Sequence, residues 1–175
     1  TDTDMLYDVV EAPLGLLYLA TYLQQQFGSK ICVKVAKSRI DFDSYAQLKE
    51  VLESFKPDII GLRTLTLFKN FFHETAAMIR HWGNNAPIIA GGPYVTSDYS
   101  TILTDKNIDL LVLGEGEITF CQVIGKIIEN NGRLPTEEIL KKIPGIAFAS
   151  PGENRGNIDK KIILITDGEE DRGGD

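Results

Sequence analysis

The sequence predicts an α/β domain built on a doubly wound, mostly parallel sheet. Strand-like and helix-like segments alternate over residues 31–130, which is the pattern of consecutive right-handed βαβ units. The expected strands are nearly continuous apolar runs, as in sheets that helices cover on both faces. Two of these runs end in glycines, at Gly91-Gly92 and at Gly114-Glu115-Gly116. Because open α/β sheets bind ligands at the carboxyl ends of their strands, these glycines predict a large ligand lying across that edge.

Periodicity and capping residues place the individual elements. Pro13 is a favourable first helical residue, and apolar residues at near-helical spacing fill residues 14–27 before Gly28 ends the helix. Ser44 and Gln47 form a capping box for a second helix, which stops at residue 57, a proline. The expected strands of this part are residues 31–36, 58–62, 87–90 and 108–113. The other expected helices are residues 69–82, 99–103 and 117–130.

Both ends of the chain depart from this pattern. A doubly wound sheet normally begins with a central strand before its first helix, and residues 1–11 make a poor strand. Either that strand precedes Thr1 in a longer parent protein, which we favour, or Lys161–Thr166 takes its place. Residues 145–149 and 161–165, joined by a polar turn, predict a hairpin at the sheet edge. We therefore expect a main domain over 1–150 and an edge hairpin with a tail over 151–175.

Composition limits the class of function. The chain has 175 residues, enough for one full domain, and its hydrophobic fraction of 43% is ordinary for a globular protein. A formal net charge of −7, without a basic stripe, argues against nucleic-acid binding. The longest apolar stretch, residues 14–23, is too short to span a membrane. We expect a cytoplasmic protein.

Cysteine and histidine do not indicate a metal site. Cys32 and Cys121 occur without a Cys-x-x-Cys pattern or a Cys/His cluster, which favours small buried side chains in a reducing cytosol. His73 and His81 lie two turns apart on one expected helix, so we place both on the solvated surface. No metal ligand is expected within the chain.

The expected strand ends carry groups that can bind rather than react. Thr64 and Thr66 supply hydroxyls after one strand. Glu117 is expected in the first turn of a helix, where its charge suits the positive end of the helix dipole. Glu115 is not needed for capping and could accept hydrogen bonds from a ligand. The sequence contains no Ser-His-Asp arrangement, no paired catalytic carboxylates and no phosphate-binding loop, which favours binding over catalysis.

Four motifs in order resemble a known family. They are Ala12-Pro13-Leu14-Gly15-Leu16-Leu17-Tyr18-Leu19-Ala20, Gly61-Leu62-Arg63-Thr64-Leu65-Thr66, Gly91-Gly92-Pro93-Tyr94 and Gly114-Glu115-Gly116-Glu117. Their order and spacing resemble the N-terminal cobalamin-binding domain of cobalamin-dependent radical SAM enzymes. That family includes methyltransferases and the anaerobic magnesium-protoporphyrin monomethyl ester oxidative cyclase. The likeness covers residues 12–149 and implies a flavodoxin-like or Rossmann-like cobalamin-binding domain.

The resemblance implies that cobalamin is held by its nucleotide tail in a cleft at the strand ends, with the corrin ring above. The residues that it places in this site are Leu14, Gly15, Thr64, Leu65, Thr66, Gly91, Gly92, Pro93, Tyr94, Gly114, Glu115, Gly116 and Glu117. The Asp-x-His-x-x-Gly motif of methionine-synthase-type domains is absent, which implies binding without a histidine ligand to cobalt. Arg63 stands where the wider fold has a serine, and Tyr94 stands where relatives often have histidine.

The catalytic half of such an enzyme lies outside this sequence. S-adenosylmethionine and a [4Fe-4S] cluster need a Cys-x3-Cys-x2-Cys motif, which the family carries in a following radical SAM domain. The parent enzyme would transfer methyl groups or catalyse oxidative cyclisation, as of a tetrapyrrole, and this chain alone would be inactive, with no catalytic residue. An alternative is a degenerate, cofactor-free docking domain of the same kind of enzyme. A phosphoacceptor receiver domain ranks below both, because Arg63 replaces the aspartate that it needs.

Overall fold

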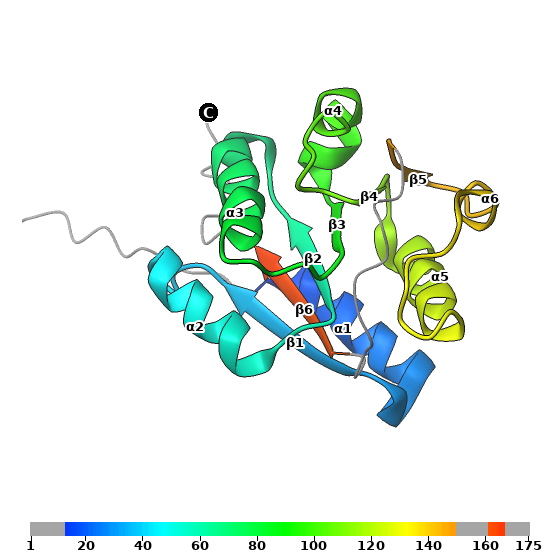
Figure 1. Ribbon diagram of the computed structural model, residues 1–175, viewed down its shortest axis with the longest axis horizontal. Coiled ribbons are helices and arrows are strands. Elements are labelled where there is room, and N and C mark those ends of the chain that lie inside the picture. The colour runs from blue at the N-terminus through cyan, green and yellow to red at the C-terminus, as the bar shows by residue number, and fades with distance from the viewer. Residues whose placement is uncertain (1–12, 150–160, 167–175) are drawn as a thin grey trace, which may run out of the picture.

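The computed structural model describes residues 13–149 and 161–166, and within them the strands form one sheet (Figure 1). The strands are β1 (Cys32–Lys37), β2 (Ile59–Arg63), β3 (Ile88–Gly91), β4 (Leu110–Val112), β5 (Ile146–Ala147) and β6 (Lys161–Thr166). Their order across the sheet is β1-β6-β2-β3-β4-β5, and every neighbouring pair is parallel except the pair of β4 with β5. The predicted doubly wound, mostly parallel sheet is confirmed.

Most of the helices lie where periodicity and capping predicted them. They are α1 (Leu14–Phe27), α2 (Tyr45–Phe55), α3 (Lys69–His81), α4 (Pro93–Ile102), α5 (Gly116–Glu129) and α6 (Glu137–Leu140), with 3₁₀ turns η1 (Gly28–Lys30) and η2 (Thr66–Phe68). The side chain of Ser44 accepts a hydrogen bond from the N–H of Gln47 at 3.3 Å, and the side-chain oxygen of Gln47 accepts one from the N–H of Asp43 at 2.6 Å. Lys56 ends α2 with a left-handed backbone (φ 52°), since the following proline disfavours a continued helix.

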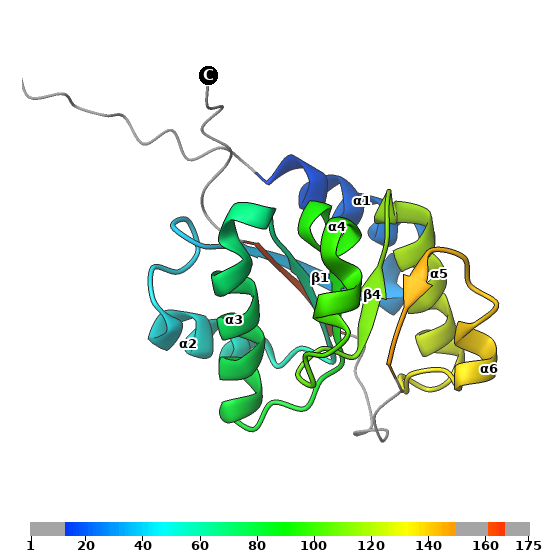
Figure 2. The same ribbon diagram turned by 90° about the horizontal axis from the view of Figure 1, so that it is seen from above.

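Two layers of helices cover the sheet, with α1 and α5 on one face and α2, α3 and α4 on the other (Figures 1 and 2). Side chains alternate between these layers along each strand, as the period of two requires. In β2, Ile60 and Leu62 pack in the core with α3 and α4, whereas Ile59 packs in the core with α1 and α5. The next two residues on that second face, Gly61 and Arg63, therefore lie under α1 and α5.

The predicted edge hairpin is wrong. β6 does not pair with β5 but lies between β1 and β2, parallel to both, while β5 pairs antiparallel with β4 at the edge. In a flavodoxin-like sheet this position belongs to the strand that comes first in the chain. Of the two alternatives for the missing central strand, the structure thus takes the one that we did not favour, in which Lys161–Thr166 occupies its place.

The composition of β6 explains this position. Its residues after Lys161 are buried without alternation, as expected for a central strand covered on both faces rather than for an edge strand. Reciprocal hydrogen bonds fasten its start to the chain before β2, because Lys161 N–H donates to the Asp58 carboxylate and Asp58 N–H donates to the Lys161 carbonyl, each at 2.6 Å. The hairpin was predicted because the two strands follow one another along the chain. The uninterrupted apolar run of β6 was the stronger indication of its position in the sheet.

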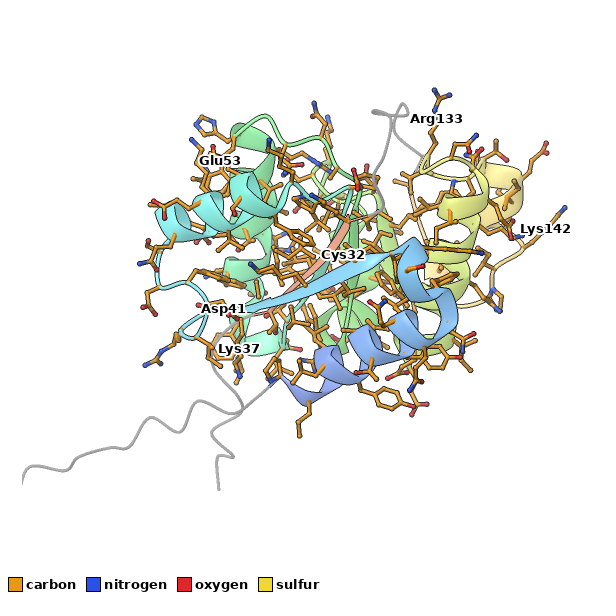
Figure 3. All side chains as sticks on the ribbon, turned by 90° about the horizontal axis from the view of Figure 1, so that it is seen from below. Cys32, Lys37, Asp41, Glu53, Arg133 and Lys142 are labelled. Atoms are coloured by element: carbon orange, nitrogen blue, oxygen red, sulfur yellow. The ribbon has the colours of Figure 1, made fainter. Side chains whose placement is uncertain are left out.

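Smaller differences concern single elements. The helix expected over 99–103 begins earlier, at Pro93, which is the first helical residue after Gly92. α6 was not predicted. Cys32 is exposed on the outer strand β1 (Figure 3), so its expected burial is wrong. Cys121 is half-buried, which raises the pKa of its thiol. The calls on residues 1–11, on the polar turn 151–159 and on the boundary at residue 150 lie outside the described residues.

Candidate functional site

A cleft of about 520 Å³ opens between α1 and α5 at the carboxyl ends of the central strands. Its floor is formed by the strand residues that face this layer, namely Gly61, Ile89, Gly91, Val112 and Leu164. Leu16 and Leu19 of α1 form one wall, and Phe120 of α5 forms another. The interior is therefore an apolar slot, which suits a flat, uncharged group.

Two of the glycines in this cleft leave space rather than fill it. A Cβ atom built on Gly15, in the first turn of α1, would have no neighbouring atom within 4 Å. A Cβ atom on Gly91 would make only ordinary contact, 3.6 Å from the carbonyl oxygen of Val112. A side chain at position 15 would therefore extend into open space at the cleft.

Gly92 has a different role from Gly91. Its φ of 99° lies in a region that side chains rarely adopt, and a Cβ atom there would come within 2.8 Å of Cγ of Arg63. Gly92 is therefore needed for the turn and for the passage of the Arg63 side chain over it. The expected role of Gly92, which was approach to a ligand, stays a prediction beside this conformational role.

Thr96 joins the two glycine junctions across the cleft mouth. Its hydroxyl donates to the carbonyl of Gly92 at 3.1 Å and accepts from the N–H of Gly114 at 2.9 Å. Gly114 also has a positive φ, of 72°, so both turns have a backbone conformation that favours glycine, and the Thr96 side chain bridges them. The two junctions thus lie side by side, and Thr96 is the link that sequence reasoning missed.

The mouth of the cleft is polar. Arg63 is half-buried and lines one side, while Glu115 and Glu117 line another. Glu117 lies in the first turn of α5, as predicted, and the side chain of Glu115 makes no capping hydrogen bond. The arrangement combines an apolar interior with charged and hydroxyl groups at the entrance, so it can bind and orient a ligand that has both an apolar and a polar part.

The predicted site residues fall into two groups. The structure brings eight of them to the cleft: Gly15, Gly91, Gly92, Pro93, Gly114, Glu115, Gly116 and Glu117. Leu14 is 72% exposed outside the cleft lining. Thr64 is buried, with its hydroxyl bonded to the carbonyl of Leu65, and Thr66 is exposed in η2. Neither of these threonines, nor Leu65, lines the cleft.

Tyr94 is also outside the cleft, on the opposite face of the sheet. Its hydroxyl lies 3.0 Å from Nε2 of His73, and Nδ1 of His73 lies 2.6 Å from a carboxylate oxygen of Asp105. A proton on Nδ1 would be donated to the carboxylate, so that Nε2 accepts from Tyr94. Burial raises the pKa of Tyr94, and the charges of Asp98 and Asp105 raise it further. His73 thus lies at the surface only in part: its side chain is 34% exposed, but both of its ring nitrogens have protein partners.

Metal-binding and membrane-spanning features can be assessed for the part of the chain that the structure describes. Within 13–149 and 161–166, no group of three or more His, Cys, Asp or Glu side chains could hold a metal ion. In the same ranges, no helix combines the length and the apolar character needed to cross a membrane.

Comparison with known proteins places this geometry in context. The family described as B12 binding domain matches residues 7–124. An uncharacterized methyltransferase of Pyrococcus horikoshii is 28% identical over 158 residues, which cover 89% of this chain and 32% of that protein. The anaerobic magnesium-protoporphyrin IX monomethyl ester cyclase of Rubrivivax gelatinosus is 26% identical over 140 residues, or 79% of this chain and 24% of that protein.

The chain thus spans about a third or less of the length of these curated relatives. No solved structure matches it. The matched family region, residues 7–124, contains the glycine junctions and the helices that enclose the cleft, apart from the end of α5.

Proposed function

This chain belongs to the B12-binding domain family, and we propose that it holds cobalamin by its nucleotide tail in the cleft between α1 and α5. The benzimidazole base would occupy the apolar interior, the sugar and phosphate would lie at the polar mouth, and the corrin ring would lie above the strand ends. Cobalamin supplies the reactive cobalt ion, and the residues of this chain bind and orient it.

The observation that carries the proposal is the open, glycine-lined slot. Gly15 and Gly91 present no side chain to it, and Leu16, Leu19 and Phe120 enclose it with apolar surface. Side chains at the two glycine positions would narrow the space in which a flat base could lie. The residues present therefore fit the tail of the cofactor.

We propose that cobalt receives no histidine from this chain's described residues. His73 is bonded to Asp105 and Tyr94 on the face of the sheet opposite the cleft. His81 is the last residue of α3 and does not line the cleft. Either residue would need a large rearrangement to approach a corrin ring at the mouth.

The parent enzyme is proposed from the relatives. One is named a methyltransferase and the other a magnesium-protoporphyrin IX monomethyl ester cyclase. We propose that the longer protein is a radical SAM enzyme that catalyses methyl transfer or oxidative cyclisation. S-adenosylmethionine and a [4Fe-4S] cluster would bind in a domain outside this chain, and this domain would present cobalamin to it.

A cofactor-free docking domain is less well supported. Such a domain has no need of an open cleft, and bulky side chains over Gly91 would be expected to fill it. No bulky side chain covers Gly91, since a Cβ atom there would meet only Val112, and this supports a ligand site instead.

Titration of the chain with hydroxocobalamin tests the proposal, with the visible spectrum and calorimetry as readouts. The matched variants are Gly15→Leu, which places a side chain in the open entrance, and Gly15→Ala, which adds only a methyl group. Neither should destabilise α1, because alanine and leucine favour helix over glycine by roughly 0.5–1 kcal/mol. We expect binding by the parent chain and Gly15→Ala, and at least tenfold weaker binding by Gly15→Leu. No spectral change and no heat with the parent chain at millimolar cobalamin would refute the proposal.

A further inference from the structure

Arg63 is the last residue of β2, and the alternation of that strand places its side chain on the cleft face with Gly61. The side chain then crosses Gly92, where the missing Cβ leaves room for it. An atom at that position would lie 2.8 Å from Cγ and 3.5 Å from Nε of Arg63. The backbone at Gly92 and the course of the arginine are therefore fitted to each other, which holds the guanidinium near the cleft mouth.

The charge of Arg63 is not neutralised in the described part of the chain. It is the one basic residue among those that line the cleft, and no ion pair between described residues includes it. Glu115 and Glu117 line the same cleft without pairing with it. Because Arg63 is half-buried, its side chain has lost part of its hydration, and an anionic ligand that supplies hydrogen bonds to it gains affinity.

We propose that Arg63 binds the phosphodiester of the cobalamin tail and so selects corrinoids that carry this phosphate. The inference rests on the proposed function. The phosphodiester is the anionic group of the nucleotide tail, and it would lie at the mouth if the base enters the slot. The planar fork of a guanidinium matches two phosphate oxygens, which an ammonium or a hydroxyl cannot do.

This assignment replaces the one that the sequence suggested. A hydroxyl contact was expected from Thr64 or Thr66, but the first is buried outside the cleft and the second is exposed outside it. Arg63, the last residue of β2, replaces the serine of the wider fold, and it is the residue that reaches the mouth. The change from serine to Arg63 thus replaces a hydroxyl with a cation, and the contact with the ligand is kept.

Three corrinoids that differ only in the tail test the proposal on the full chain. Dicyanocobalamin has phosphate, ribose and base, dicyanocobinamide phosphate has the phosphate alone, and dicyanocobinamide has none of them. Excess cyanide gives all three the same ligands on cobalt. Dissociation constants are measured for the parent chain, Arg63→Met, Arg63→Lys and a control, Arg133→Met. Arg133 is an exposed residue beyond the far end of α5 (Figure 3).

We expect Arg63→Met to bind cobalamin and cobinamide phosphate about 10- to 100-fold more weakly than the parent chain, the range for a lost hydrogen bond to a charged group. Cobinamide should bind unchanged. Arg63→Lys should lie between, because it keeps the charge without the fork, and Arg133→Met should match the parent chain. Far-UV circular dichroism and the unfolding midpoint establish that each variant is folded. If Arg63→Met does not fold, the affinities of Arg63→Lys for the three corrinoids test the proposal instead.

Other outcomes overturn the inference in distinguishable ways. If Arg63→Met weakens the binding of all three corrinoids equally, Arg63 maintains the shape of the site and does not bind the phosphate. Unchanged binding of cobalamin would show that Arg63 makes no contact with the tail, while leaving the proposed function in place. If the parent chain binds none of the three, the proposed function fails and this inference fails with it.

Discussion

The hydroxyl of Thr96 accepts a hydrogen bond from the backbone N–H of Gly114 at 2.9 Å, which ties the first turn of α4 to the loop that follows β4. The same hydroxyl donates to Gly92 one helical turn earlier. One short side chain therefore spans the two strand ends between which the cleft opens. We therefore expect the width of the mouth to depend on this link.

Replacement of Thr96 tests whether this link sets the cleft. Thr96→Val keeps the shape and removes both hydrogen bonds, whereas Thr96→Ser keeps the hydroxyl. Because the site is exposed, we expect Thr96→Val to lose only about 0.5–1.5 kcal/mol of unfolding free energy in urea. Its affinity for hydroxocobalamin should fall roughly three- to tenfold, which is under 1.4 kcal/mol. Equal affinities of Thr96→Val and the parent chain would show that the link does not shape the binding site.

The two adjacent glycines should respond differently to alanine. Gly92→Ala places a side chain at a φ of 99° and against Arg63, so we expect it to cost about 1–3 kcal/mol of unfolding free energy. Gly91→Ala meets only ordinary contacts and should change stability by less than about 0.5 kcal/mol. Urea unfolding of both variants measures this contrast. A Gly92→Ala variant as stable as Gly91→Ala would contradict the conformational role of Gly92.

Local sequence signals predicted much of this fold. Pro13, Ser44 and the apolar periodicities gave the helices, and the apolar runs gave the parallel strands, because each signal acts within a few residues. The position of β6 depends instead on which strands are neighbours in space. A turn-like segment between two strand-like runs suggests a hairpin, yet burial of an uninterrupted apolar strand favours the centre of the sheet.

The candidate site was predictable in part for the same reason. Glycines at strand ends identify the edge where a ligand binds, so Gly91 and Gly114 were found. The threonines were misplaced, because the face of a strand on which a residue lies changes with every step. Counting the alternation through β2 would have placed Gly61 and Arg63 together on the cleft face. Thr96 could have been found four residues after Gly92, once the helix was known to begin at Pro93.

Tyr94 gives the domain a predictable response to alkaline pH. Burial raises its pKa in the folded state above the ordinary value of 10.0, so the stability that its neutral form contributes is present below pH 10 and lost as pH rises through the folded pKa. Tyr94→Phe loses the hydrogen bond to His73, which we expect to cost about 1 kcal/mol near pH 8.

The difference between the parent chain and Tyr94→Phe should shrink between pH 10 and 11, because only the parent chain loses the contribution of a neutral Tyr94. Urea unfolding at a series of pH values measures the difference. Tyr99→Phe, at an exposed position of the same helix, controls for the general loss of a phenol. A difference that stays constant up to pH 11 would argue that Tyr94 is not held in its neutral form by burial.

The central position of β6 makes a final prediction about stability. Ile163 is fully buried in the middle of β6, opposite Lys34 of β1 and Ile60 of β2, whereas Ile146 is only half-buried in the edge strand β5. Ile163→Ala should therefore cost about 2–5 kcal/mol of unfolding free energy, the range for a large-to-small change in a core. Ile146→Ala should cost about 1 kcal/mol or less, because the half-buried site loses less apolar contact. Urea unfolding of the two variants distinguishes a central β6 from the edge hairpin that the sequence suggested. In a hairpin, both strands would lie at the edge, and the two losses of unfolding free energy would be similar.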